Sequence, residues 1–114
     1  MLLMHSDPAE FTALSPAEMQ EIIGKYRAWS QGLRDGGKMI SGEKLRDDAG
    51  KVLRHGGAAV TVKDGPYPES KEMLGGYFVV EAPDYAAAVE IAKGCPHVRP
   101  GSTGAIEIRQ IHET

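Results

Sequence analysis

The stretch Gly76-Tyr77-Phe78-Val79-Val80-Glu81 contains the clearest information on how this chain folds. Its aromatic and β-branched residues favour a β-strand. Successive side chains of a strand point to opposite faces, so Phe78 and Val80 face one way and Tyr77 and Val79 face the other. A half-exposed strand would alternate apolar with polar residues, but here both sets are apolar. The stretch therefore predicts a sheet that needs cover on both faces.

The best-marked element boundary lies upstream, at Leu14-Ser15-Pro16-Ala17-Glu18. Ser15 suits a helix N-cap, proline suits the first helical position, and Glu18 can complete a capping box. The glycines of Asp35-Gly36-Gly37 favour termination. Between these signals, apolar residues recur at spacings of three and four: Met19, Ile22, Ile23, Tyr26, Trp29 and Leu33. These features predict a helix over residues 16–35.

Further elements follow from the same rules. We expect strands at 1–5, 38–41 and 105–111, a hairpin over 52–62 with its turn at 55–57, and a helix after Asp84 that ends at Gly94. The apolar stripe of that second helix is Tyr85, Ala88, Val89 and Ala92.

The order strand, helix, strand, hairpin, strand, helix, strand predicts an α+β ferredoxin-like sandwich. It contains two βαβ units with an extra hairpin, and both helices lie on one face of an antiparallel sheet. A twofold homodimer, joined sheet to sheet, is the simplest cover for the second face.

The chain has 114 residues, which is the length of a single domain spanning 1–114. Its net charge of −3, with acids and bases interspersed, argues against nucleic-acid binding. It lacks an apolar run of roughly 20 residues, so we expect no membrane span. The start of the chain does not resemble a secretory signal, and the single cysteine, Cys95, fits a reducing compartment. These features predict a cytoplasmic protein.

One group of candidate site residues lies on the predicted inner face of the sheet: Tyr77, Glu81, Glu107 and Arg109. Arg109 has the chemistry to bind a substrate carboxylate, and Glu107 or Glu81 to move a proton. The alternative is an ion-pair network in the seam of a dimer.

A second group follows the hairpin. Asp64, in a Gly-Pro turn, suits a general base, and Glu69 and Lys71 are candidates to line a pocket formed by the 64–76 loop. Gly75 and Gly76 would allow a ligand to approach the backbone closely. The alternative is that Asp64 forms an Asx-turn and the loop charges are simply solvated.

His5 lies at the end of a predicted inner strand and would form an acid–base pair with Asp64 if the two meet. The alternative is a histidine at the surface or in a turn. The spacing of His5, His55, His97 and His112 matches no zinc signature, so we expect no metal site. The Gly75-Gly76 pair lacks the spacing of a phosphate or dinucleotide loop, and we expect no cofactor. Cys95 follows a helix end, a position that disfavours a thiolate nucleophile.

The stretch Asp64-Gly65-Pro66-Tyr67-Pro68-Glu69-Ser70-Lys71-Glu72-Met73-Leu74-Gly75-Gly76-Tyr77 resembles the signature of the YCII-related proteins, in the branch named for its Asp-Gly-Pro-Phe motif. Tyr67 stands where that branch usually has phenylalanine. Ser41-Gly42-Glu43-Lys44-Leu45 and Gly104-Ala105-Ile106-Glu107-Ile108-Arg109 resemble further family segments. The resemblance implies a ferredoxin-like protomer in a dimeric α/β barrel.

The resemblance implies little about activity. Relatives include a dehydrochlorinase, and members often accompany extracytoplasmic-function sigma factors.

Two functions follow as hypotheses. The first is a cofactor-free acid–base enzyme, of lyase, isomerase or hydrolase type, that acts on a small metabolite in a pocket between the sheet and the 64–76 loop. In it Asp64 is the base, His5 the acid and Arg109 the group that orients the substrate. The second is a non-catalytic ligand sensor or regulatory partner, for example of an extracytoplasmic-function sigma factor.

Overall fold

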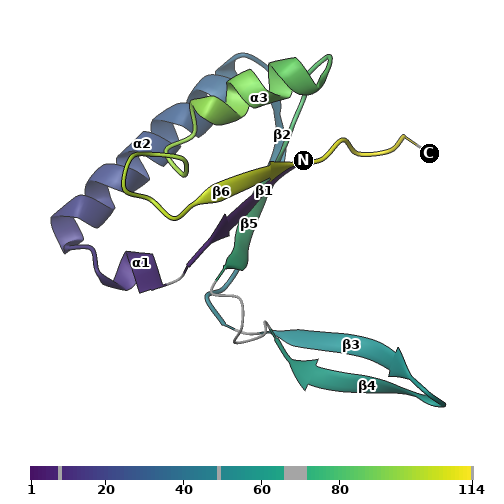
Figure 1. The fold of residues 1–114 in the computed structure, drawn as a ribbon. Helices are drawn as coiled ribbons and strands as arrows, with labels where there is room; N and C mark the ends of the chain where they lie inside the picture. The colour runs from purple at the N-terminus through teal and green to yellow at the C-terminus, as the bar shows by residue number, and fades with distance from the viewer. Residues whose placement is uncertain (8, 49, 66–71, 114) are drawn as a thin grey trace.

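Four antiparallel strands form the main sheet of the computed structural model, which describes residues 1–7, 9–48, 50–65 and 72–113 (Figure 1). The strands are β1 (Leu2–Ser6), β2 (Met39–Lys44), β5 (Met73–Val80) and β6 (Ala105–Ile108), in the order β2-β5-β1-β6. Helices α2 (Pro16–Asp35) and α3 (Tyr85–Lys93) cover one face. This α+β arrangement is consistent with the predicted ferredoxin-like fold.

The hairpin forms a sheet of its own, β3 (Lys51–Gly56) with β4 (Ala59–Asp64). In Figure 1 it projects from the end of the main sheet. A short helix, α1 (Ala9–Thr12), lies between β1 and α2. None of the helices in the described part of the chain combines the length and apolar character needed to cross a membrane.

The predicted signals at both ends of α2 are present. The Ser15 hydroxyl accepts from the amide of Glu18 (3.1 Å), and the Glu18 carboxylate accepts from the amide of Ser15 (3.3 Å). At the other end, the amide of Lys38 donates to Leu33 and that of Gly37 to Arg34, which is the Schellman pattern. Gly37 has a φ of +70°, which a residue without a Cβ adopts readily. Local chemistry thus fixes the length of this helix.

The core lies between the helices and the sheet. Leu2, Met4, Ala92 and Cys95 are its buried apolar side chains. The predicted stripe of α2 is half-buried, and its Tyr26 and Trp29 pack against this core. The Trp29 ring meets Phe78 edge-on, with centroids 5.1 Å apart. Phe78 and Val80 both pack against the core, as the alternation along β5 predicted.

Several predicted boundaries were wrong. Strand β2 continues to Lys44, where we expected a loop from Gly42, and β5 begins at Met73, inside the predicted loop. Strand β6 ends at Ile108 instead of 111, and α1 was missed. Pairing with a neighbouring strand extends or ends the three strands, and local composition does not indicate it. The predicted stripe of α3 was wrong in part, because Tyr85 is 50% and Val89 37% exposed.

The carboxylate of Glu10 connects α1 to the segment before β6 by hydrogen bonds and an ion pair. It accepts from the Thr103 hydroxyl (2.7 Å) and amide (3.3 Å) and pairs with Arg99 (3.2 Å). Burial by itself raises the pKa of Glu10, but the hydrogen bonds from Thr103 and Ser102 and the charge of Arg99 outweigh it and hold the pKa below its ordinary value. The charged form therefore stabilises the fold.

We expect Glu10→Gln to lower the free energy of unfolding at pH 7 by about 1–3 kcal/mol, because a partly buried, charge-assisted contact is lost. A carboxyl whose pKa is depressed by folding stabilises the fold above its unfolded pKa and loses that contribution as pH falls through the folded value. The difference between wild type and variant should therefore shrink below pH 4.5. Urea denaturation at pH 7 and pH 3 measures both effects.

The matched control is Glu21→Gln, which breaks a wide, exposed pair with Lys25 (3.6 Å) and should change stability little. An equal loss of unfolding free energy in the two variants would contradict the stabilising role of the charged Glu10 side chain.

Gly76 lies where β5 passes close to β2. A Cβ at this position would be 2.8 Å from the backbone oxygen of Glu43, whereas one at Gly75 would be 3.9 Å from its nearest neighbour, the backbone oxygen of Met4. We expected both glycines to allow a ligand to approach the backbone closely. At Gly76 the backbone of the neighbouring strand β2 occupies the space that a side chain or a ligand would fill.

Gly76→Ala should therefore destabilise the fold by about 1–3 kcal/mol, because a strand backbone must move to accept the methyl group. Gly75→Ala should change stability by less than half of that, and thermal unfolding of the two variants compares them. A tolerated alanine at 76 would show that β2 is free to shift.

Candidate functional site

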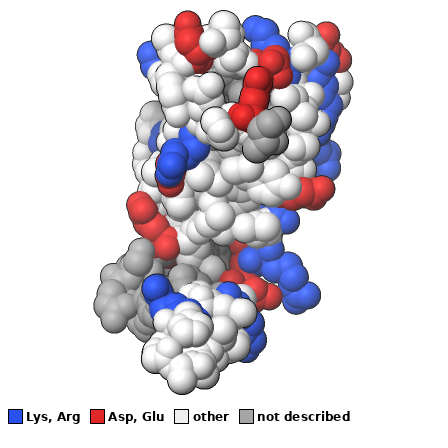
Figure 2. Space-filling view, turned by 90° about the vertical axis from the view of Figure 1, so that its right-hand side faces the viewer, with Lys and Arg blue, Asp and Glu red and all other residues white. Residues whose placement is uncertain are grey.

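A single row of side chains crosses all four strands on the face away from the helices. The strand register aligns Glu43 with Tyr77, Tyr77 with Leu3, and Leu3 with Glu107. The neighbouring row, which contains Leu2 and Phe78, faces the core. We call the outward side the open face. Figure 2 views the molecule from this side, with uncharged surface in the middle of the body and charged groups around it.

The open face brings together three of the predicted site residues. His5 Nε2 lies 3.1 Å from Glu107 Oε1, and Arg109 Nη1 donates to Glu107 Oε2 at 3.2 Å. One carboxylate therefore connects a histidine from β1 to an arginine just beyond β6. In cross-strand terms, His5 is the diagonal neighbour of Glu107, because β1 pairs Leu3 with Glu107 and His5 with Ala105. Tyr77 lies half-buried in the same row.

The electrostatics of this cluster favour a charged Glu107. Hydrogen bonds from Arg109 and then from His5 lower the pKa of the Glu107 carboxyl. Since a carboxylate only accepts, the proton of this contact is on Nε2 of His5. Within the described part of the chain, Nδ1 of His5 has no hydrogen-bond partner. The ring is thus oriented through one nitrogen, and 28% of the His5 side chain is exposed.

The backbone of His5 is held from the core side by His97. Nε2–H of His97 donates to the carbonyl of His5 (2.8 Å), and the Tyr26 hydroxyl donates to Nδ1 of His97 (2.8 Å). His97 is 5% exposed, and burial raises the pKa of Tyr26. A part-buried chain of hydrogen bonds therefore connects α2 to the strand position that carries the open-face histidine. No motif or spacing in the sequence indicated this role for His97.

Asp64 does not share this cluster. It ends β4 and pairs with Lys51 at the base of the hairpin, with 77% of its side chain exposed. Glu81, just beyond β5, is exposed. Glu69 and Lys71 lie outside the described residues, as do Pro66 to Ser70 of the predicted pocket loop. Their assigned roles, and that of Asp64, stay predictions.

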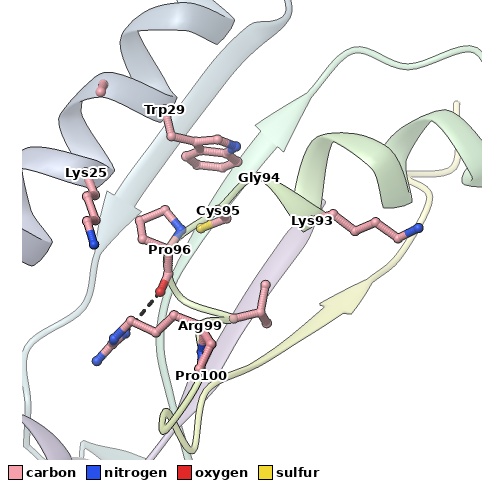
Figure 3. A pocket seen from close by; sticks show the side chains of 10 residues that line it. Lys25, Trp29, Lys93, Gly94, Cys95, Pro96, Arg99 and Pro100 are labelled. Atoms are coloured by element: carbon pink, nitrogen blue, oxygen red, sulfur yellow. Dashed lines mark hydrogen bonds between the residues drawn. The ribbon is translucent and has the colours of Figure 1, made fainter.

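A hollow of about 500 Å³ lies between α2 and the segment after α3 (Figure 3). Trp29 and Pro96 line it, Lys25 and Arg99 lie on one side, and Lys93 points away. Lys25 and Arg99 are each paired with a glutamate of this chain. The hollow is therefore a weaker candidate than the open face.

Two further features bear on chemistry. Cys95 is buried, and burial raises the pKa of its thiol to about 11, which disfavours the thiolate form, as does its position after a helix end. Among the described residues, no group of three His, Cys, Asp or Glu side chains is placed to hold a metal ion.

The relative effects of Arg109 and His5 on the pKa of the Glu107 carboxyl can be measured. We expect Arg109→Gln to raise the pKa of the Glu107 carboxyl, because the larger of the two stabilising hydrogen bonds is lost. His5→Gln should raise it less, and Arg99→Gln, on the helix side, should leave it unchanged. Carboxyl-carbon NMR titration gives these values. A larger effect of His5→Gln would reverse the assignment.

The chain is similar to known proteins over nearly its whole length. A family model described as the YCII-related domain matches residues 1–114. An uncharacterized protein of Rhizobium meliloti (strain 1021) is 27% identical over 111 residues, covering 96% of this chain and 89% of that protein. The match is compatible with the Asp-Gly-Pro-Phe branch, which stays a prediction. The chain belongs to the family of proteins with a YCII-related domain.

Proposed function

We propose that this protein is a cofactor-free acid–base enzyme that acts on a small carboxylate metabolite at the open face. The observation that supports it is the contact of a single carboxylate, Glu107, with both His5 and Arg109. A histidine that donates one ring N–H to a carboxylate has its tautomer and orientation fixed, and its other nitrogen serves as a base. Here that nitrogen is Nδ1.

The chemistry divides among the three side chains. His5 Nδ1 takes a proton from the substrate, and Glu107 stabilises the imidazolium that forms. The Arg109 guanidinium offers further N–H groups to a substrate carboxylate, since only Nη1 is engaged with Glu107. In this proposal His5 takes the role of base that the sequence suggested for Asp64, because only His5 lies in the cluster with Arg109.

A second copy of the chain is part of the proposal. His5 has 28% and Arg109 69% of its side chain exposed, so water reaches both groups in one protomer. Acid–base catalysis gains from a site that excludes water. A homodimer that pairs open faces would enclose the cluster and bury Leu3, Tyr77 and Val79, which follows the dimeric α/β barrel expected from the family resemblance.

The proposal predicts proton abstraction next to a carbonyl. Phenylpyruvate is a suitable probe, because it carries an aromatic ring, a carboxylate and exchangeable carbon-bound hydrogens. We expect the protein to accelerate exchange of these hydrogens for deuterium, as followed by proton NMR. His5→Gln should reduce the rate by about 10²–10⁴-fold, which is typical for loss of a general base. Arg109→Gln should chiefly raise KM.

His112→Gln, in the exposed C-terminal segment, is the matched control and should retain the wild-type rate. An unchanged rate in His5→Gln would rule out the assigned base. Binding of phenylpyruvate without exchange would overturn the enzyme and favour the ligand-sensing alternative.

A further inference from the structure

The pairing of β1 with β5 is interrupted at His5. In the register of these two strands, Met4 lies opposite Gly76. His5 lies opposite Leu74, so Gly75 is an extra residue of β5 without a partner in β1. A bulge of this kind bends a strand and changes the direction of a side chain, and bulges are over-represented beside active sites. Strand pairing with β5 therefore constrains the position of His5 less than that of the residues before it.

A hydrogen bond from outside the sheet holds the backbone at this point. His97, in the segment after α3, donates from Nε2 to the carbonyl of His5 at 2.8 Å. A carbonyl oxygen only accepts, so the proton of this bond is on Nε2 of His97. Nδ1 of the same ring accepts from the Tyr26 hydroxyl of α2, also at 2.8 Å. Tyr26 thus favours the tautomer of His97 that donates to His5.

His97 itself has little room to move. It is buried, and a Cβ at Gly104 would lie 3.0 Å from both Cδ2 and Nε2 of its ring. Its carbonyl accepts from the Ser102 hydroxyl at 3.1 Å. The chain that leads into β6 therefore holds His97 in place, and β6 also carries Glu107.

His5 is held at two points. His97 binds its carbonyl from the core side, and Glu107 binds its ring on the open face. The first contact sets where the backbone of His5 lies, and the second sets how the ring is turned. Together they determine where Nδ1, the nitrogen of the proposed base, lies relative to a substrate.

We propose that His97 is a positioning residue of the reaction, whose Nε2–H holds the backbone of His5 so that Nδ1 of His5 reaches the substrate proton. This inference rests on the proposed function, in which His5 is the base. A general base must lie within hydrogen-bond reach of the proton that it removes. A misplacement of about 1 Å lowers a rate by up to about 10²-fold. A histidine that does not touch the substrate therefore controls kcat.

Three variants separate this contact from the stability of the fold. His97→Leu removes the donor to His5, whereas His97→Gln keeps a side-chain N–H of similar reach. Tyr26→Phe removes the hydroxyl that fixes the tautomer of His97. Ser30→Ala is the matched control, because it also removes a part-buried hydroxyl from α2, but one that donates within the helix, to the carbonyl of Arg27.

For each variant, kcat and KM are measured by deuterium exchange of phenylpyruvate. Urea denaturation gives the free energy of unfolding. The Cε1–H signal of the His5 ring in NMR spectra reports its environment independently of activity.

We expect His97→Leu to lower kcat by about 10–10²-fold and to shift the ring signal of His5. KM should stay nearly unchanged, because the backbone amide of Arg109 donates to Met1, just before β1, and this contact does not involve His97. His97→Gln should restore most of kcat. Tyr26→Phe should lower kcat less than His97→Leu does, and Ser30→Ala should leave it at the wild-type value.

The outcomes separate this inference from the proposed function. A folded His97→Leu with the wild-type kcat would overturn the positioning role and leave His5 as the base. An equal loss of kcat in His97→Leu and His97→Gln, or a loss that follows unfolding free energy across all four variants, would also overturn it. If His97→Leu does not fold, equal kcat values in Tyr26→Phe and Ser30→Ala would do the same. A wild type without exchange activity would overturn the proposed base together with its positioning residue.

Discussion

Two helices cover one face of a four-stranded sheet, and this one-sided cover determines most of what the protein can do. Leu2, Phe78 and Val80 pack beneath α2 and α3, whereas Leu3 and Tyr77, one residue along the same strands, face outward. Apolar side chains that face water favour association. The open face therefore carries the titratable cluster. It is also the surface where the binding of a partner would remove exposed apolar side chains from water.

The cluster depends on the core through the backbone. His97 is buried, and its two ring nitrogens bind Tyr26 on a helix and the carbonyl of His5 on a strand. A shift of α2 or of the segment after α3 would therefore reach the open-face histidine directly. The Glu10 contacts with Arg99 and Thr103 hold the same segment from its other side. The hydrogen bonds of this segment therefore contribute both to the stability of the fold and to the position of His5.

Local signals predicted the elements that local chemistry controls. The capping box at Ser15, the N-cap at Asp84 and the alternation along β5 each act within a few residues, so they can be recognised in the sequence. Strand ends proved less predictable. Strand β2 extends to Lys44 because β5 pairs with it, and β6 stops at Ile108, where its register with Leu2 ends. Such limits depend on partners distant in the chain.

Some features of the candidate site can likewise be predicted from local sequence, and others depend on contacts between distant strands. The residues alone indicate which chemical groups are present, that Glu107 lies on the outward side of its strand, and that the chain is an α+β protein of the YCII-related family. The folded chain was needed to show that His5 contacts Glu107 while Asp64 pairs with Lys51, and that the hairpin extends from the body. The cause is strand register, because side-chain periodicity assigns a residue to a face, whereas hydrogen bonding between distant strands sets which residue lies opposite it.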